Sequence, residues 1–468
     1  MSFVLLLNLL VKPGWLVVEN LVQNQVGHAE YGLFAALLNL ALITSVLADL
    51  GLAQHTTKRI ASAPEYLAEY FPTVLPLKVA LSGLFLGGTL LVGWLLGYRG
   101  HTLVLLGLAT GIVLLTQFTA FLRGALQGYQ RFNIDAVLSV LDKATAILLL
   151  LGGLSLGVAL TLDGYVIVRA GATLLTFVTL YALLTRLYGR VPYRPRWSQA
   201  RTVLRESLPL AAIALVYGLN ERVDGLMLER LVSAREAGYY AGAYRWVDAV
   251  MMYLWTVLPL FFAKFAHATA RRDEQQTLLW FGQRIVTVPL LLVCAFVLFR
   301  GEVLFWQFTR STPAELVRMT WCLKLLFLNV LVHAFFAIYS TLLTSTGQEQ
   351  PVSWLVAGST LLNISLNLLL LPRYGALAAA ADTLLCALFV SGGYLWLVTR
   401  RTGVAVPWAT LARLLLAFGL LCAAWWGLRW WLNTWWLEAG LASGLFVGIL
   451  FLTGNVRVAE LRQLLQRK

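Results

Sequence analysis

The chain has 468 residues, of which 59% are hydrophobic and only 12% are charged, and its formal net charge is +14. Soluble globular proteins carry about 25% charged residues, so this composition excludes an ordinary soluble domain. A positive net charge can mark a nucleic-acid surface, but in so apolar a chain it more often reflects basic loops beside a membrane. The composition therefore predicts a membrane protein without a nucleic-acid partner.

Apolar stretches recur along the whole chain, and each is long enough to cross a hydrocarbon core of about 30 Å. Proline residues such as Pro64, Pro192 and Pro351 separate neighbouring stretches. We predict an all-α polytopic protein whose fourteen membrane-spanning helices lie at residues 2–23, 31–52, 73–97, 102–126, 134–155, 157–184, 207–231, 237–262, 278–299, 317–343, 352–371, 375–399, 408–431 and 434–452.

Lys and Arg gather at one end of these spans, above all in the connection 186–205 and in the tail 457–468. Cytoplasmic connections of membrane proteins are enriched in Lys and Arg. Both termini are therefore predicted to be cytoplasmic, which agrees with an even number of spans.

An internal repeat predicts how the spans are grouped. The stretch 27–36 aligns with 233–242 at an offset of 206, and Gly128 pairs with Gly347 at an offset of 219. Parallel repeats of this kind imply two lobes around a pseudo-twofold axis along the membrane normal, with a cleft between them. We predict a six-helix lobe (1–185), a cytoplasmic linker (186–206), a second six-helix lobe (207–400) and two extra helices with a basic tail (401–468).

The most informative stretch is the helical hairpin 205–262, which carries five charged residues inside apolar helices. A charge at the centre of a membrane helix costs about 2.5–3.5 kcal/mol on insertion scales, so it needs a partner or a wet cavity. The hairpin is therefore expected to line a polar interior. Arg245 and Asp248 lie three residues apart and are expected to share a helix face. The charged residues are Glu221, Arg222, Asp224, Arg245 and Asp248.

Two other charged positions admit two interpretations each. Lys12 precedes Pro13 and Gly14 in the first span and either faces a cavity at a kink or pairs with a carboxylate. Asp49 ends the second span and is either a gate contact or an ordinary interfacial residue. Asp142 with Lys143 and Asp163 with Arg169 are interpreted as structural pairs or as helix-end groups. Interhelical hydrogen bonds are expected for Asn363 and Asn367, and an interfacial belt for Trp425, Trp426, Trp430, Trp431, Trp435 and Trp436.

No catalytic or metal-binding motif is evident. The sequence lacks HExxH, GxSxG and P-loop patterns, its five His residues are scattered, and its four Cys residues lie in apolar runs without metal-like spacing. No predicted outer loop is large enough to resemble that of a glycan polymerase. We therefore expect neither an enzyme nor a metal site.

The order of several short motifs resembles the polysaccharide transporter family, the Wzx-type oligosaccharide flippases of the multidrug/oligosaccharidyl-lipid/polysaccharide flippase superfamily. The resemblance covers spans one to twelve. Its motifs are Lys12-Pro13, Glu30-Tyr31-Gly32, Asp49-Leu50-Gly51-Leu52, Leu126-Gln127-Gly128, Arg222-x-Asp224, Gly238-Tyr239-Tyr240, Ala243-x-Arg245, Gly347, Asn363 with Asn367, Leu371-Pro372-x-x-Gly375 and Ala378-Ala379-Ala380.

The resemblance implies transfer of undecaprenyl-diphosphate-linked oligosaccharide from the inner to the outer leaflet of the bacterial cytoplasmic membrane. A diphosphate needs cationic donors, so Lys12, Arg222 and Arg245 are expected to bind it and Asn220 to bind sugar. No cofactor is expected, although a Na⁺ or H⁺ gradient or the membrane potential is a candidate driving force. The candidate coupling or gating carboxylates are Glu19, Asp49, Asp224 and Asp248.

Three alternatives stay open at this point. A lipid II flippase has the same lobes and helix number, and a multidrug antiporter belongs to the same superfamily but fits the cationic candidates less well. An integral-membrane glycan polymerase or ligase is the alternative from a different class. Membrane lipids and glycan polymerases or glycosyltransferases are the expected partners besides the substrate.

Overall fold

The structure is a computed structural model that describes residues 2–50, 52, 71–128, 130–189, 197–268, 271–432 and 434–455. Every regular element in these ranges is a helix. By their contacts the helices form two compact units, Met1–Ala241 (unit 1) and Gly242–Lys468 (unit 2). The boundary between the units lies inside one long helix.

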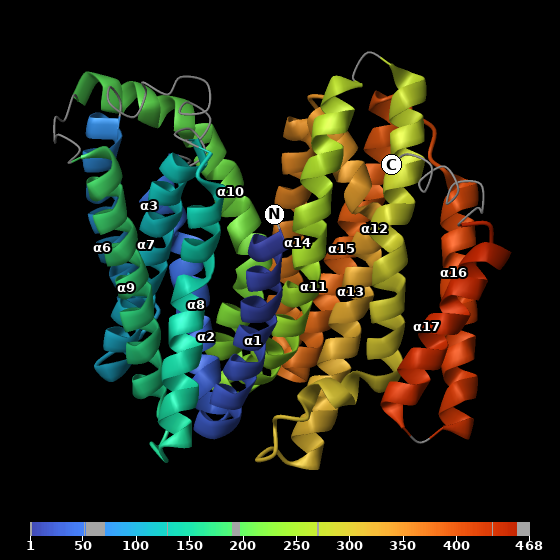
Figure 1. Cartoon of the computed structure of the whole chain (residues 1–468), viewed down its shortest axis with the longest axis horizontal. Helices are drawn as coiled ribbons and strands as arrows, with labels where there is room; N and C mark the ends of the chain where they lie inside the picture. The colour runs from blue at the N-terminus through green and yellow to red at the C-terminus, as the bar shows by residue number, and fades with distance from the viewer. Residues whose placement is uncertain are drawn as a thin grey trace. The chain divides into compact units, whose positions relative to one another are not determined.

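Unit 1 contains nine helices among the described residues, the last of which continues into unit 2 (Figure 1). They are α1 (Ser2–Val26), α2 (His28–Thr44), α3 (Val46–Asp49), α6 (Phe71–Leu95), α7 (His101–Gly128), α8 (Phe132–Ser155), α9 (Leu162–Tyr188), α10 (Trp197–Leu231) and the start of α11 (Ala234–His267), with Leu52 in a further helical stretch.

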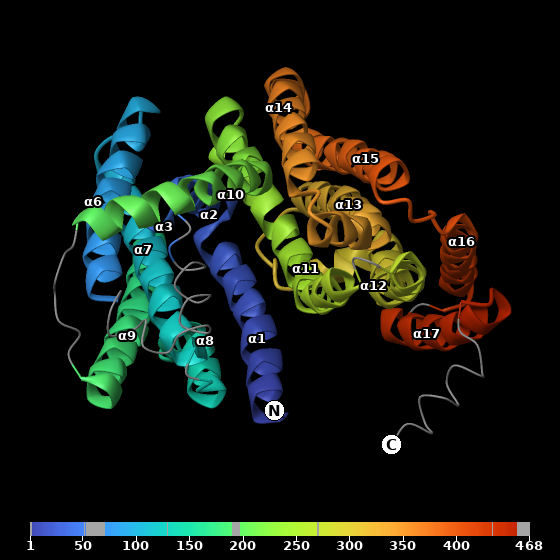
Figure 2. The same ribbon diagram turned by 90° about the horizontal axis from the view of Figure 1, so that it is seen from above.

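Unit 2 contains the rest of α11 and the helices that follow it. These are α12 (Arg272–Arg300), the short 3₁₀ helix η1 (Gly301–Phe305), α13 (Pro313–Ser345), α14 (Glu349–Tyr374), α15 (Ala376–Arg401), α16 (Trp408–Trp431) and α17 (Trp435–Leu452). Within unit 2, α13 and α14 both pack against α15 (Figure 2).

Each of the fourteen predicted spans coincides with a helix or, for the second span, with two helices in sequence. The second span is interrupted at Ser45, where α2 ends and α3 begins. Part of the predicted linker is also helical, because α10 begins at Trp197 rather than near residue 207. Figures 1 and 2 show this first part of α10 running across one end of unit 1.

Twelve of the described helices are long and apolar enough to cross a membrane. The two predicted spans outside this set are α1 and α10, and α10 is the helix with the most charged residues inside a predicted span. The chain is therefore a multi-pass membrane protein, and its least apolar long helix belongs to the hairpin singled out above.

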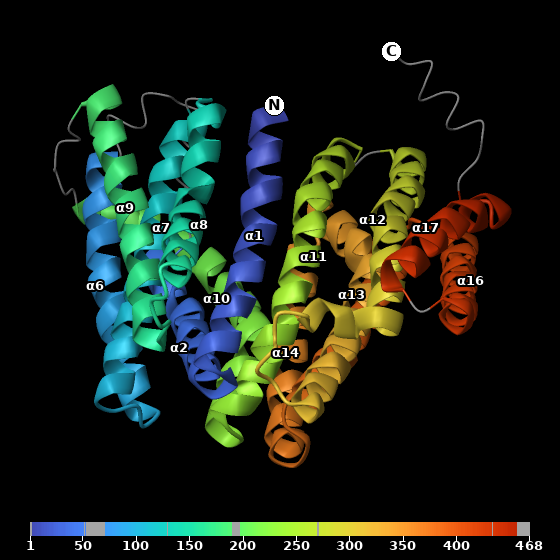
Figure 3. The same cartoon turned by 60° about the horizontal axis from the view of Figure 1, so that its bottom comes forward.

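The apolar core of unit 2 includes the two C-terminal helices. Figure 3 shows α16 and α17 beside α12, and the Arg300 Nε donates to Glu438 Oε2 over 2.7 Å to join α12 to α17. Trp425 is buried and stacks on Phe299 with ring planes 7° apart, so it belongs to the core rather than to the predicted aromatic belt. The other five tryptophans of that belt are exposed.

The division into lobes at residues 186–206 stays a prediction. The contact-based units are divided at Ala241 instead, because α10 and the first turns of α11 pack on α2 of unit 1. The grouping by contacts thus differs from the grouping by sequence repeat.

Candidate functional site

Lys12 lies half-buried on α1, three residues before Trp15 on the same helix face. The charges that act on its ammonium are those of Lys143 on α8 and Arg123 on α7, and both repel it. Among the described residues Lys12 makes no ion pair. Lys12, Arg123 and Lys143 are named here the cation cluster, of which Arg123 is paired with Asp135 and Lys143 with Asp142.

Gly14 allows α1 to approach α8 at this level. A Cβ added to Gly14 would lie 3.7 Å from Ile147 of α8. Pro13 lies inside α1, as expected, and the helix continues past it to Val26. The Pro–Gly pair thus lies where the first helix passes closest to the helix that carries Lys143.

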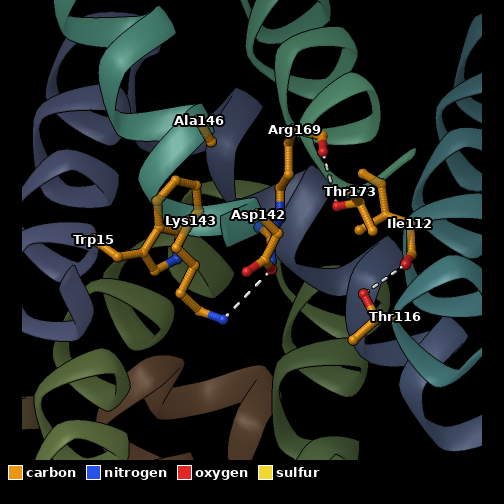
Figure 4. A pocket seen from close by; sticks show the side chains of 8 residues that line it. All are labelled: Trp15, Ile112, Thr116, Asp142, Lys143, Ala146, Arg169 and Thr173. Carbon is orange, nitrogen blue, oxygen red and sulfur yellow. Dashed lines mark hydrogen bonds and ion pairs between the residues drawn. The ribbon is translucent and has the colours of Figure 1, made fainter. Parts of the chain in front are cut away.

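A small polar cavity opens beside the cation cluster and offers about 100 Å³ to water (Figure 4). Figure 4 shows Asp142 and Lys143 of α8 side by side at the cavity, and their charged atoms are 3.6 Å apart. The expected pairing of these two neighbours is confirmed. The remaining lining residues are Trp15, Ile112, Thr116, Ala146, Arg169 and Thr173.

The half-buried guanidinium of Arg169 lines one side of this cavity. Its Nη1 lies 3.1 Å from Glu19 Oε1 and donates to the Tyr165 hydroxyl over 2.9 Å. The Tyr165 hydroxyl donates to the same Glu19 oxygen over 3.0 Å, and the guanidinium also lies over the Trp15 ring at 5.5 Å. Of the two interpretations of Asp163 with Arg169, the structural pair is wrong, and Asp163 lies at a helix end, in the first turn of α9. Asp163 instead lies 3.0 Å from His101 Nε2.

Asp49 is held by a buried lysine that the sequence analysis did not single out. Lys78 of α6 is fully buried, donates to Asp49 Oδ1, and lies 5.6 Å from the centre of the Phe121 ring. A buried ammonium is stable only when it is paired. The pair joins α3 to α6, and Leu50, directly after it, adopts a left-handed conformation with φ of 42° that ends α3.

The charged residues of α10 lie at different depths. Asp224 is buried and accepts a hydrogen bond of 2.9 Å from the Tyr240 hydroxyl of α11, within unit 1. Asn220 and Arg222 are half-buried, and Glu221 is exposed. The hairpin therefore buries the carboxylate of Asp224 and leaves the neighbouring charges half-buried or exposed, and its interpretation as the lining of a polar interior stays a prediction.

Arg245 and Asp248 lie on the part of α11 that belongs to unit 2, where Arg245 is buried and Asp248 is half-buried. The pairing expected from their spacing stays a prediction. The membrane helix thus carries a deeply placed guanidinium, which costs free energy unless polar groups or water surround it.

Three further buried polar residues of unit 2 lie in α14 and α15. Asn367 Nδ2 donates to Asn363 Oδ1 over 3.0 Å within α14, so the two amides bond to each other along one helix. Asp382 of α15 is fully buried, and the sequence analysis did not identify it as a candidate residue. Its signal was a single carboxylate inside an apolar run, which is the same signal that identified Asp224.

These observations describe polar and charged groups of both signs placed inside apolar helices. Among the described residues no group of His, Cys, Asp and Glu has the geometry of a metal site. The three buried cysteines and the half-buried Cys422 are free thiols.

Comparison with known proteins gives the family. Residues 1–261 match the model of a family described as polysaccharide biosynthesis protein. A membrane protein of Methanocaldococcus jannaschii, described as uncharacterized, is 22% identical over 382 residues, which cover 78% of this chain and 88% of that protein.

The fold is similar to that of solved transporters. The lipid II flippase MurJ in an inward closed conformation superposes with a TM-score of 0.78 at 12% identity, covering 96% of this chain and 99% of that chain. An inward-facing multidrug resistance MATE transporter superposes with a TM-score of 0.66 at 15% identity, covering 83% and 94%. These neighbours are transporters and not enzymes. The chain therefore belongs to the polysaccharide biosynthesis protein family and has the fold of the multidrug/oligosaccharidyl-lipid/polysaccharide flippase transporters.

Proposed function

We propose that this transporter moves an oligosaccharide linked to undecaprenyl diphosphate from the inner to the outer leaflet of the cytoplasmic membrane, for surface polysaccharide biosynthesis. The observation that carries the proposal is the cation cluster of unit 1. Lys12 is half-buried among apolar helices, and the charges acting on it are the like charges of Lys143 and Arg123. An anionic ligand would relieve this repulsion.

A diphosphate is an anion of suitable chemistry for such a site. Ammonium and guanidinium groups bind phosphate oxygens through charge-assisted hydrogen bonds. Lys12 and Lys143 supply the ammonium groups, whereas the Arg123 guanidinium is already held by Asp135 with its Nε 2.6 Å from Oδ1. In this proposal Arg222 and Arg245 add guanidinium donors and Asn220 binds sugar. The polyprenyl tail stays in the lipid.

The carboxylates divide into two groups by their contacts. Glu19 is bound by the half-buried Arg169 and Asp49 by the buried Lys78, which favours a role in holding helices together. Asp224 and Asp248 lie on the charged hairpin, and we place any Na⁺ or H⁺ coupling there. An inside-negative potential also favours outward movement of an anion by about 2.3 kcal/mol per charge per 100 mV.

The proposed orientation places both termini in the cytoplasm. The connections between α1 and α2, between α6 and α7, between α8 and α9, and between α10 and α11 then face outward. We call this end of unit 1 its outer end. Glycosyltransferases that make the lipid-linked substrate and polymerases that use it are the partners that such a step requires.

The test is complementation of a strain that lacks its oligosaccharide flippase. Lys12→Ala, Lys143→Ala, Arg222→Ala and Arg245→Ala are expressed in this strain, and surface glycan and membrane abundance are measured. Lys264→Ala is the matched control, because Lys264 is an exposed lysine near the end of α11. We expect loss of glycan at normal abundance for the four variants, partial recovery with Lys12→Arg, and no change for the control.

Full activity of all four variants would contradict the cationic site. Failure of the wild-type protein would contradict the proposed substrate. In that case the purified protein in proteoliposomes is tested for the three alternatives. Transport of lipid II would indicate a lipid II flippase, transport of cationic drugs would indicate a multidrug antiporter, and glycosyl transfer would indicate a polymerase or ligase.

A further inference from the structure

A second cavity opens at the outer end of unit 1, where α1 ends and where α2, α7 and α9 begin. It offers about 450 Å³ to water, against about 100 Å³ beside the cation cluster. Sites for small molecules usually measure about 300–1,000 Å³. This cavity, named here the outer pocket, is therefore large enough for a ligand such as a sugar unit. Its polar lining residues are Gln25, Glu30, His101, Thr161 and Asp163.

The polar lining comes from the ends of four helices. Gln25 lies in the last turn of α1, and Glu30 lies in the first turn of α2. His101 begins α7, and its Nε2 lies 3.0 Å from Oδ1 of Asp163, in the first turn of α9. This contact holds the imidazole and the carboxylate side by side. Glu30, His101 and Asp163 are exposed, so a ligand reaches the outer pocket from solvent.

The apolar part of the lining belongs to packed regions of unit 1. Leu105 and Leu162 are buried in the apolar core of this unit, and Leu33 of α2 packs against that core. The Gly164 N–H donates to Thr161 Oγ1 over 3.1 Å, which caps α9 and holds the chain in front of it. Helix packing and capping thus shape the pocket before a ligand arrives, and such preorganisation reduces the entropy lost on binding.

The outer pocket is distinct from the cavity beside the cation cluster. On α7, Leu105 lines the outer pocket and Ile112 lines the other cavity. On α9, Leu162 and Arg169 line the outer pocket and the other cavity in the same order. Each pair is seven positions apart (112 − 105 and 169 − 162), which is about 10 Å along a helix. Tyr165 of α9 is fully buried at the level between the two cavities, so one is not an extension of the other.

The charges of the outer pocket restrict the ligands that it can bind. Glu30 and Asp163 are carboxylates, and His101 is the only basic side chain among the described residues of the lining, so a phosphate is repelled. The described carboxylates and imidazoles do not form a metal site. Sugar hydroxyl groups donate to carboxylates through charge-assisted hydrogen bonds, and the C–H groups of a sugar ring pack on leucine side chains. The lining therefore suits a neutral sugar or an amino sugar.

We propose that the outer pocket binds a sugar unit of the transported glycan on the outer side of the membrane. This inference rests on the proposed function and orientation, because these supply a glycan at that end of unit 1. The cation cluster holds the diphosphate, and the acidic outer pocket receives the uncharged part of the cargo once it has crossed. A sugar bound there stays within reach of the enzyme that next uses the glycan.

The first experiment measures sugar binding to the purified protein. Leu33→Cys and, separately, Gln25→Cys place a thiol in the outer pocket, in a background where the four native cysteines are replaced. Glucose, galactose, mannose and N-acetylglucosamine are titrated to about 100 mM against the rate of maleimide labelling, since so small a ligand binds weakly. At about ten times its Kd a sugar should slow labelling about tenfold, because about a tenth of the sites are then free. Leu96→Cys, in the turn between α6 and α7, is the matched control and should be unaffected, because Leu96 does not line the pocket.

Removal of the carboxylates tests the chemistry of binding. Glu30→Gln with Asp163→Asn keeps the shape of the lining and removes both charges, and it should raise the sugar Kd by about tenfold or more. Glu302→Gln is the control, because Glu302 is a partly exposed carboxylate of unit 2. An unchanged Kd in the double variant, or no protection of either thiol by any of the four sugars, overturns the proposal. Protection by CaCl₂ or spermidine in place of sugars would indicate a cation site and overturns it as well.

The second experiment tests whether the bound sugar comes from the transported glycan. Leu33→Cys is labelled in intact cells with a membrane-impermeant maleimide, in a strain that makes the lipid-linked glycan and in one that lacks its glycosyltransferases. We expect slower labelling in the strain that makes the glycan. Equal rates would overturn the link to the cargo, and labelling only after permeabilisation would overturn the outer placement of the pocket.

These measurements separate failure of this inference from failure of the proposed function. If the wild-type protein restores no surface glycan, the proposed substrate fails, but sugar protection of the purified protein still reports on the outer pocket because it needs no transport. If glycan is restored and neither thiol is protected by sugar, the outer pocket fails while the proposed function stands.

Discussion

Unit 1 and unit 2 stabilise their membrane helices in different ways. In unit 1, charged pairs such as Glu19–Arg169 and Asp49–Lys78 join helices that are far apart in the sequence. Unit 2 also has a buried ion pair, Arg300 with Glu438, but it adds neutral bonds between α12 and α13: Gln283 Nε2 donates to the Phe335 carbonyl over 2.7 Å, and Thr287 donates to that of Ala334 over 2.7 Å.

The difference shows in which unit charged side chains are desolvated at a cost in free energy. A buried ion pair barely offsets its own desolvation, whereas neutral hydrogen bonds and apolar packing stabilise more simply. Unit 1 is also the unit that holds the cation cluster and its cavity. Charged pairs near a site for an anion keep the helices in place while leaving other cations available to the ligand.

The comparison is tested most strongly at Lys78. Lys78→Ala removes a fully buried ammonium, leaves the half-buried Asp49 without it, and is expected to destabilise the protein by about 3–5 kcal/mol. Thermal unfolding in detergent, followed by size-exclusion chromatography, measures the change. The double variant Lys78→Met with Asp49→Leu removes both charges and is expected to recover most of the loss. A single variant as stable as wild type would show that this pair does not hold α3 to α6.

Trp425 tests the contribution of apolar packing in unit 2. Trp425→Ala removes a buried ring that stacks on Phe299 and is expected to cost about 3–5 kcal/mol. Trp431→Ala is the matched control, because that ring is 89% exposed and its loss is expected to change stability by less than about 0.5 kcal/mol. Equal losses of stability for the two variants in the same unfolding assay would contradict the assignment of Trp425 to the core and favour the predicted aromatic belt for both rings.

Gln283 tests the neutral hydrogen bonds of unit 2. Gln283→Leu keeps the volume and removes the donors to Thr287 and to the Phe335 carbonyl, so a loss of about 1–2 kcal/mol is expected. The loss should be clearly smaller than that of Lys78→Ala. A larger loss would reverse the contrast between the units.

Tyr98 gives the smallest expected effect, and it appears only at high pH. Burial and the hydrogen bond to Glu229 raise the pKa of Tyr98 above its ordinary value of about 10. The protonated phenol is thus favoured in the folded state, so its contribution is complete below about pH 10 and declines as the pH rises further. The melting temperature of wild type should fall faster between about pH 9 and 11 than that of Tyr98→Phe. Parallel curves would mean that Tyr98 does not couple folding to pH.

The sequence by itself determined the positions of the helices and the positions of the charged residues within them. Apolar runs of membrane length have one stable form in lipid, because a helix satisfies its own backbone hydrogen bonds, and all fourteen predicted spans are helical. It also located the charged hairpin, Lys12 and the repeat that relates Gly32 to Gly238, since these are visible as exceptions to an apolar pattern.

Only the tertiary structure decided which of these groups meet. Arg169 pairs with Glu19, 150 positions away, rather than with Asp163, and Asp49 pairs with Lys78 of α6. Trp425 turns inward although its neighbours face outward. Periodicity reports the faces of one helix, whereas a partner on another helix depends on how the helices pack. For that reason the sequence repeat relates Gly32 to Gly238, whereas only the fold shows that the two residues are in contact.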